Sequence, residues 1–178
     1  MTDKWTRLPD YPGNRVSNVK GFAINNEGFV GFGNNIMEFW KYKQDTKEWA
    51  ELSCLPGCDL PFCFSITVGS KAYIGCGFDQ IDVYEYDPLF ETWTAKGIYP
   101  GKGKDKLCGF SINNKAYIGL GFDQDTWYQD FWEYSPEDNS WIKLMDCPIS
   151  TAYGFSTNLF GYIIICCPVI WQFDPTKN

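Results

Sequence analysis

The stretch that decides the fold is Gly109-Phe-Ser-Ile-Asn-Asn-Lys-Ala-Tyr-Ile-Gly-Leu-Gly121. It contains two short runs in which large apolar residues alternate with small or polar ones, the period-two pattern that is typical of β-strands. The Asn-Asn pair between the runs tolerates positive φ and predicts a tight hairpin turn. The closing Gly-x-Gly indicates a place where the backbone bends or another chain segment comes close.

This hairpin phrase occurs four times along the chain. The other copies are Gly21-Phe-Ala-Ile-Asn-Asn-Glu-Gly-Phe-Val-Gly-Phe-Gly33, Cys63-Phe-Ser-Ile-Thr-Val-Gly-Ser-Lys-Ala-Tyr-Ile-Gly-Cys-Gly77 and Gly154-Phe-Ser-Thr-Asn-Leu-Phe-Gly-Tyr-Ile-Ile-Ile-Cys166. Each is followed by an aromatic phrase: Phe39-Trp-Lys-Tyr42, Tyr84-Glu-Tyr86, Phe131-Trp-Glu-Tyr134 and Ile170-Trp-Gln-Phe173. A further phrase begins at Trp5, Trp49, Trp93 and Trp141, spaced by 44, 44 and 48 residues. The repetition predicts a unit of four short antiparallel strands.

Composition agrees with an all-β fold. The chain has 178 residues, 19% of them aromatic, and 17 glycines, which favours strands and tight turns over helices. One such sheet cannot bury its aromatic face, whereas sheets stacked in series around an axis can, as in a β-propeller. We therefore expect one domain over residues 1–178, with four four-stranded blades at about 13–55, 56–99, 100–147 and 148–178 plus 1–10.

The repeat resembles the kelch family. The resemblance covers nearly the whole chain and is carried by the spacing from Tyr86 to Trp93 and from Tyr134 to Trp141, by Arg15 ahead of Phe22, and by the glycine pairs Gly31/Gly33, Gly75/Gly77 and Gly119/Gly121. The Gly-x-Gly form looks like the galactose-oxidase-type kelch variant. The resemblance implies a kelch-like propeller, in a family whose rings usually have six or seven blades and whose relatives include a copper oxidase and a sialic-acid mutarotase.

The two ends of the chain are in phase with the repeat. The fourth unit stops before its Trp strand, and the chain begins with that phrase, Trp5-Thr-Arg-Leu-Pro9. The N-terminal strand is therefore expected to complete the last blade, which hides an open sheet edge. It does so either within its own chain, giving four blades, or in a second chain, giving an eight-bladed dimer. A third interpretation makes the chain a piece of a longer array.

Several classes of function are excluded or disfavoured by composition. There is no histidine, which removes Ser-His-Asp and Cys-His catalysis and the copper site of the oxidase relative. The net charge of −7 argues against a nucleic acid or an anionic membrane as the main partner, and no apolar run is long enough to span a membrane. The eight cysteines lack zinc-site spacing and are expected to be mostly unpaired, so we predict no metal and no cofactor. Unpaired thiols and the absence of a visible signal peptide favour the cytoplasm, with the extracellular space or periplasm left open.

The candidate binding residues lie in the longest loop after a glycine pair, Phe122-Asp-Gln-Asp-Thr-Trp-Tyr-Gln-Asp130, which is four residues longer than its counterpart in the second repeat. The predicted site consists of two aromatic residues and three carboxylates: Trp127, Tyr128, Asp123, Asp125 and Asp130. An exposed aromatic ring beside carboxylates can stack on a sugar face and accept hydrogen bonds from its hydroxyls. The competing interpretation is that the loop folds back and Trp127 covers the blade edge.

Two neighbouring features are expected to be solvated rather than functional. The Asp123-Gln-Asp125 run matches no calcium-loop pattern, so we interpret it as an acidic turn. Lys102, Lys104 and Lys106 alternate with Gly and Asp and predict a mobile connector.

The sequence thus predicts a non-enzymatic propeller that serves as a protein-interaction or scaffold module, with self-association as an open option. The alternative is a carbohydrate-binding or sugar-processing propeller, with a mutarotase-like activity as the only enzymatic option. A third hypothesis is a structural part of a larger parent protein. The expected partner is a protein, a second copy of the chain, or a glycan.

Overall fold

The computed structural model describes residues 4–14, 17–33, 37–57, 60–77, 80–150, 153–164 and 169–177. These residues form antiparallel sheets and one short 3-10 helix, η1 (Pro175–Lys177). The all-β fold class is therefore confirmed. Arg15, which contributed to the kelch resemblance, lies outside the described residues.

Four sheets follow one another along the chain and correspond to the four repeats. Blade 1 consists of β1 (Lys20–Ile24), β2 (Glu27–Gly31), β3 (Phe39–Lys43) and β4 (Glu48–Leu52). Blade 2 consists of β5 (Phe64–Val68), β6 (Lys71–Gly77), β7 (Gln80–Asp87) and β8 (Thr92–Ile98). Blade 3 consists of β9 (Cys108–Ile112), β10 (Lys115–Gly119), β13 (Phe131–Ser135) and β14 (Ser140–Lys143). Blade 4 consists of β15 (Tyr153–Ser156), β16 (Gly161–Ile164) and β17 (Ile170–Phe173).

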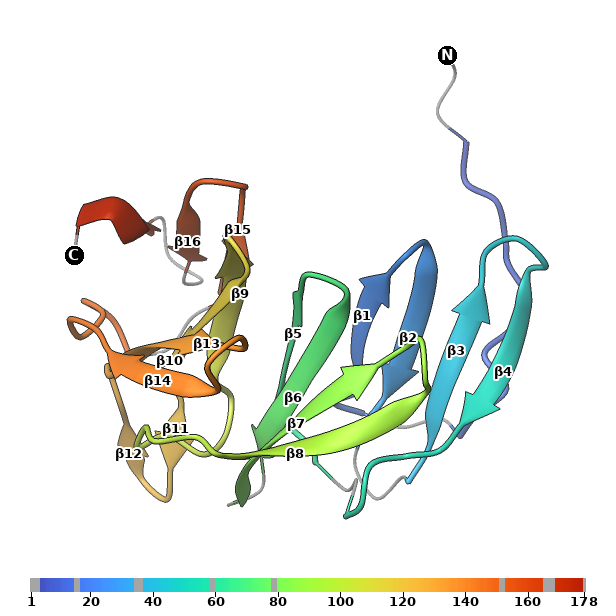
Figure 1. Cartoon of the computed structure of the whole chain (residues 1–178), viewed down its shortest axis with the longest axis horizontal. Coiled ribbons are helices and arrows are strands. Elements are labelled where there is room, and N and C mark those ends of the chain that lie inside the picture. Colours follow the sequence, from blue (N-terminus) through green and yellow to red (C-terminus); the bar gives the residue numbers. More distant parts are fainter. Residues whose placement is uncertain are drawn as a thin grey trace.

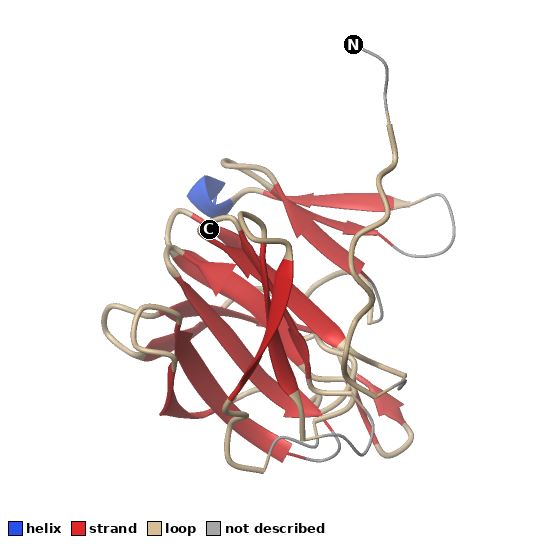
Figure 2. Ribbon diagram, turned by 90° about the vertical axis from the view of Figure 1, so that its right-hand side faces the viewer, coloured by secondary structure: helices blue, strands red, loops and turns tan. Residues whose placement is uncertain are grey.

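The blades are arranged as a four-bladed propeller that forms an open arc (Figure 1). The first strands of successive blades are neighbours, β1 beside β5, β5 beside β9 and β9 beside β15. Seen from the side, the molecule is almost entirely strands and turns, and the N-terminal segment runs out beyond the sheets (Figure 2). Between β10 and β13, a two-stranded hairpin projects from blade 3, made of β11 (Phe122–Asp123) and β12 (Thr126–Trp127).

The apolar core lies between the blades. One buried cluster joins Phe29 and Phe39 of blade 1 to Ile74 and Tyr86 of blade 2, and Trp93 packs against it. Equivalent clusters join blade 2 to blade 3 and blade 3 to blade 4. Every cluster draws residues from two sheets, so no blade has a complete core of its own and stacking supplies the burial, as the repeat predicted.

The hairpin and glycine predictions are confirmed at the level of backbone angles. Asn113 and Asn114 have φ of 50° and 60°, which is the left-handed conformation that a tight two-residue turn requires. A Cβ on Gly119 would overlap the carbonyl oxygen of Asp130, the residue before β13. The middle residue of the Gly-x-Gly phrase also adopts positive φ and is fully buried, as Leu120 shows with φ of 63°.

The N-terminal segment does not complete the last blade of its own chain. Residues 4–10 are exposed and contain no strand, the side chain of Trp5 is 100% exposed, and the sheet of blade 4 has three strands. The reason is that the segment is held on blade 1, where the indole Nε1 of Trp49 donates to the carbonyl oxygen of Pro9 at 3.3 Å. The Tyr11 ring also packs against Trp49, with 5.4 Å between centroids. Blade 4 lies at the other end of the arc (Figure 1). Completion by a second chain stays a prediction.

The cysteine prediction is confirmed at four positions and wrong at one. The free, buried thiols are Cys63, Cys76, Cys108 and Cys147, whereas Cys54 is disulfide-bonded. Cys58, Cys166 and Cys167 lie outside the described residues. Burial raises the pKa of Cys63 and of Cys108 to about 12, so these two thiols stay protonated and act as small apolar side chains.

Substitution of Gly119 tests the close approach at the end of β10. Gly119→Ala pushes a Cβ into the Asp130 carbonyl and the Phe131 backbone, so we expect it to lower the free energy of unfolding by about 2–4 kcal/mol. The matched control is Gly28→Ala in β2, where the new Cβ meets only the Cβ of Tyr42 at 3.8 Å. Chemical denaturation monitored by tryptophan fluorescence measures both. Equal stabilities for the two variants would contradict the packing described above.

Candidate functional site

The predicted loop is an ordered hairpin whose two strands pair Phe122 with Trp127 and Asp123 with Thr126. The Phe122 and Trp127 rings pack together with 4.9 Å between centroids. Trp127 nevertheless keeps 40% of its surface exposed. The hairpin therefore folds back in part, as the competing interpretation held, but it leaves an aromatic surface facing solvent.

The connector at 102–106 packs against this hairpin, while Lys102 and Lys106 are exposed, as the sequence suggested. The Lys106 ammonium lies 5.5 Å from the ring centroids of both Phe122 and Trp127. The Nζ of Lys104 forms an ion pair with Asp123 Oδ2 at 3.3 Å, and the backbone N–H of Lys104 donates to the Phe122 carbonyl oxygen at 3.0 Å. Cation–π contacts and backbone hydrogen bonds therefore connect this segment to the hairpin, whereas its mobility stays a prediction.

Asp130 is a buried anchor for the preceding connection. Its Oδ2 accepts hydrogen bonds from the backbone N–H of Lys102 at 3.1 Å and from Trp132 Nε1 at 2.8 Å. Blade 1 repeats this arrangement, since Glu38 Oε2 accepts from the backbone N–H of Asn14 at 3.0 Å. A carboxylate at this position therefore ties a blade to the chain segment that enters it, a role that the period of the sequence did not reveal.

Three of the five predicted site residues line one pocket. Trp127, Tyr128 and Asp130 border a depression of about 320 Å³ together with Lys102, Lys143, Asp146 and Ser150. Lys102 Nζ lies 5.9 Å from the centroid of the Tyr128 ring. The structure does not bring Asp123 and Asp125 to this pocket, because Asp123 pairs with Lys104 and Asp125 is exposed at the hairpin turn.

Sequence reasoning missed half of the lining. Lys143 ends β14, and Asp146 and Ser150 lie on the connection that follows it. They reach the pocket only because β14 is the outer strand of the same sheet, and nothing in their own sequence distinguishes them from other surface residues. In the described part of the chain, no group of three or more Cys, Asp or Glu is placed to hold a metal ion.

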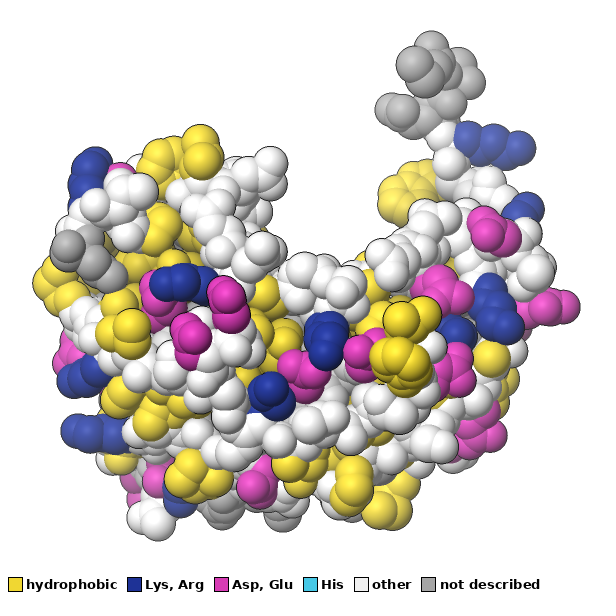
Figure 3. All heavy atoms as spheres, viewed as in Figure 1, with side chains coloured by type: hydrophobic (Ala, Val, Ile, Leu, Met, Phe, Trp, Pro, Cys, Tyr) yellow, Lys and Arg dark blue, Asp and Glu magenta, His cyan; other side chains and the backbone are white. Residues whose placement is uncertain are grey.

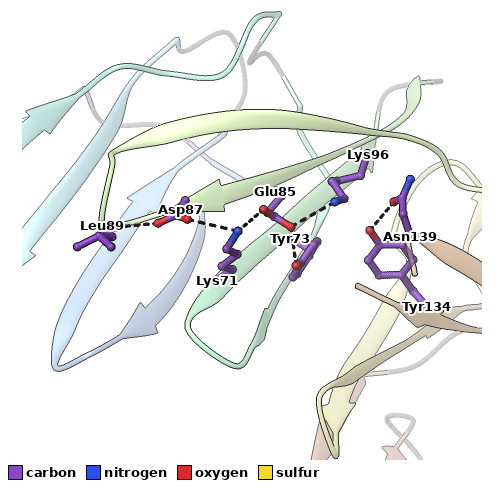
Figure 4. A network of polar contacts seen from close by, with 8 residues as sticks. All are labelled: Lys71, Tyr73, Glu85, Asp87, Leu89, Lys96, Tyr134 and Asn139. Carbon is purple, nitrogen blue, oxygen red and sulfur yellow. Dashed lines mark hydrogen bonds and ion pairs between the residues drawn. The ribbon is translucent and has the colours of Figure 1, made fainter. Parts of the chain in front are cut away.

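A second polar cluster lies inside blade 2 (Figure 4). Glu85 accepts from Lys71 Nζ at 2.6 Å and from the Tyr73 hydroxyl at 2.7 Å, and Lys96 Nζ lies 3.5 Å from it. Blade 3 repeats the cluster, where Glu133 accepts from Lys115 and Tyr117. Because the same triad recurs at equivalent positions and its hydrogen bonds are satisfied internally, we assign it to sheet stability rather than to a site.

The pKa of Glu85 follows from these contacts. Burial opposes its ionisation, but the hydrogen bonds from Lys71 and Tyr73 and the charge of Lys96 outweigh burial, so the pKa lies below the ordinary value for glutamate. Charged groups of both signs are mixed over the middle of the molecule (Figure 3).

Comparison with known proteins supports the fold alone. No family model matches the chain, and no curated protein matches it. Among solved structures, that of YjhT is similar, with a TM-score of 0.79 and 17% sequence identity, and it covers 96% of this chain. The similar region is 66% of the YjhT chain, so this chain spans about two thirds of its length. The propeller architecture rests on this likeness and on the sheets, whereas membership of the kelch family stays a prediction.

No helix among the described residues is long and apolar enough to cross a membrane.

Removal of the Asp130 carboxylate tests its anchoring role. Asp130→Ala leaves the Lys102 N–H and the Trp132 indole without their acceptor, so we expect a loss of about 1–3 kcal/mol of stability and faster amide exchange in 102–106. Asp125→Ala, in the same loop but exposed, serves as the control and should change neither the stability nor the amide exchange of 102–106. Hydrogen exchange by mass spectrometry distinguishes them, and unchanged exchange in 102–106 of the Asp130 variant would refute the anchor.

The lowered pKa of Glu85 predicts a specific acid sensitivity. A carboxylate whose folded pKa lies below its unfolded value stabilises the fold above about pH 4.5 and loses that contribution as the pH falls through the folded value. Glu85→Gln should therefore be less stable than wild type at pH 7 by about 1–3 kcal/mol, with the difference shrinking below pH 4. Urea titrations from pH 3 to 7 measure this, and a difference that is constant with pH would contradict the ionised pairing.

Proposed function

We propose that this protein is a non-enzymatic, kelch-like propeller that binds another protein through the pocket beside the β11–β12 hairpin. The observation that carries the proposal is the exposed face of Trp127 next to Tyr128 at the rim of a pocket with charges of both signs. Partly exposed Trp and Tyr surrounded by charged groups are the composition of a protein-binding hot spot. Anchoring of the connector by Asp130 and Lys106 pre-organises this surface, which reduces the entropy lost on binding.

Two carboxylates near the pocket each use one oxygen for a structural contact, which favours binding over catalysis, and their other oxygens, Asp123 Oδ1 and Asp130 Oδ1, are buried without a hydrogen-bond partner. Asp130 holds the Lys102 N–H and the Trp132 indole, and Asp123 holds Lys104. A mutarotase-like activity would use an arginine, and the sequence has only Arg7 and Arg15. Arg7 lies in the exposed N-terminal segment and pairs with Asp10 at 2.8 Å, away from the pocket.

Carbohydrate binding is the second candidate, favoured by the same aromatic pair. Tyr128 and Trp127 could stack on a sugar ring while Lys102 and Ser150 exchange hydrogen bonds with its hydroxyls. Against it, one part of the Trp127 ring is already covered by Phe122 and Lys106.

Substitution of the hairpin aromatics tests the protein-binding proposal. The double variant Trp127→Ala, Tyr128→Ala should lose affinity for a partner by about 30-fold or more while its melting temperature changes little. The control is Leu89→Ala, Phe90→Ala, which removes two apolar side chains from blade 2 that are more exposed than Trp127. Partners are captured by cross-linking in an extract of the source cells, purified, and titrated by calorimetry against all three proteins. A partner that binds the double variant as well as it binds wild type would place the site elsewhere.

A glycan array with the same three proteins decides the alternative. Binding of one glycan class by wild type and control but not by the double variant would favour carbohydrate recognition. If no glycan on the array binds and millimolar sugars do not raise the melting temperature, carbohydrate binding would be excluded.

A further inference from the structure

The fourth strand of blades 1, 2 and 3 carries a tryptophan at the same position, where its ring packs on a tyrosine of the third strand; we call this position the indole slot. The ring of Trp49 packs on Tyr42 at 5.1 Å between centroids, Trp93 on Tyr86 at 4.8 Å, and Trp141 on Tyr134 at 4.6 Å. In each case the tyrosine lies on the third strand of the same blade, opposite a small residue of the second strand. In blade 4 the equivalent residue is Phe173, which lies opposite Gly161.

Trp93 shows how the slot is built. Its ring lies against Tyr86 of its own blade and Phe39 of the preceding blade, with centroids 4.8 and 5.2 Å away. Phe39 and Tyr86 meet edge to face at 5.0 Å. The indole Nε1 of Trp93 donates to the carbonyl oxygen of Ser53 at 3.0 Å.

The same walls surround an apolar pocket of about 210 Å³ between blades 3 and 4. It is lined by Phe131 and Phe173, the counterparts of Phe39 and Tyr86, and these rings meet edge to face at 5.6 Å. Met145 also lines it, and this residue follows Trp141 by four positions, just as Ser53 follows Trp49. The pocket therefore has the aromatic walls of an indole slot, with the Met145 backbone at the position of the hydrogen-bond acceptor.

The sheet edge beside this pocket is open. β17 pairs with β16 on one side and, among the described residues, has no strand on the other. Trp171 and Ile170 on this strand are exposed, at 42% and 56%. An unpaired edge with apolar side chains is a template for adding a strand.

The N-terminal segment matches this edge in sequence and, within the residues that the structure describes, pairs with no strand. Trp5-Thr-Arg-Leu-Pro9 has the phrase that starts each fourth strand, and Trp5 is fully exposed. Pro9 accepts from Trp49 as Ser53 accepts from Trp93, and the residues just before Ser53 form β4. The acceptor Ser53 directly follows the fourth strand of the sheet next to Trp93. Because Pro9 is the corresponding acceptor for Trp49, residues 4–8 correspond to the fourth strand of a sheet next to blade 1.

We propose that the pocket between blades 3 and 4 binds Trp5 of a second copy of this chain, whose residues 4–8 add to β17 as the fourth strand. Within one chain, blade 1 and blade 4 lie at opposite ends of the arc with a hollow between them, so the donor and the acceptor cannot meet (Figures 1 and 3). Reciprocal exchange between two copies completes both last blades and gives a twofold-symmetric dimer of eight blades. This interface uses blades 1, 3 and 4; its pocket shares Asp146 with the pocket beside the β11–β12 hairpin but does not include Trp127 or Tyr128.

The oligomeric state of the full chain and of Trp5→Ala tests the proposal. Light scattering after size exclusion should give twice 20.5 kDa for wild type at micromolar concentration. Trp5→Ala should weaken dimerisation by about 30-fold or more, because a tryptophan in an aromatic pocket is a typical hot spot. The side chain is exposed within its own chain, so the variant should fold with unchanged monomer stability. The control is Leu89→Ala, an exposed apolar residue of blade 2, which should dimerise as wild type does.

A photocrosslink identifies where Trp5 binds. p-Benzoylphenylalanine at position 5 in one isotopically labelled population, mixed with an unlabelled one, should crosslink to residues 145–148 or 170–173 of the other population. A monomeric wild type, a dimer that Trp5→Ala leaves intact, or crosslinks only within one chain would each overturn the proposal. None of these results bears on partner binding at Trp127, so the two proposals fail separately.

Discussion

The structure depends on burial of aromatic faces between neighbouring sheets. A four-stranded sheet of this size exposes one or both faces to water unless another sheet covers it, and here each apolar cluster takes residues from two successive blades. The Trp93–Tyr86 and Trp141–Tyr134 contacts lie at these junctions, where a large flat ring packs between two sheets. Trp49, Trp93 and Trp141 each lie on the fourth strand of a blade, so the number of residues between them is the length of one blade repeat.

Buried and partly buried carboxylates add specific hydrogen bonds to this apolar packing. Asp130 and Glu38 accept backbone hydrogen bonds from the segments that enter blades 3 and 1, so each of these two blades is tied to the chain segment that leads into it. The triads around Glu85 and Glu133 link the second and third strands within a blade. The β11–β12 hairpin of blade 3 departs from this repeated pattern and leaves Trp127 partly exposed.

Period and turn chemistry are local properties, and they predicted the strands, hairpins and glycine contacts well. The Asn113-Asn114 turn and the close approach at Gly119 need only the residues themselves and their nearest partner. What failed depended on distant geometry. The phase of the two ends predicted that Trp5 belongs to the fourth strand of the last blade, but within this chain Trp5 is fully exposed, because sequence phase carries no information on how far around the axis four blades reach. For the same reason, Trp127 and Tyr128 were found as an unusual insertion, whereas Lys143 and Asp146 became their neighbours only through the pairing of β13 with β14.

Because each core is shared by two sheets, the blades differ in how many neighbours support them. Blades 2 and 3 contribute to two buried clusters each, while blades 1 and 4 contribute to one. Stability along the arc then behaves as a linear chain of coupled units, in which the terminal members fray before the interior opens. In the isolated chain, outside the proposed dimer, blade 4 brings the fewest described strands to its single junction, so thermal unfolding should begin there and advance inward, rather than occur as one cooperative event.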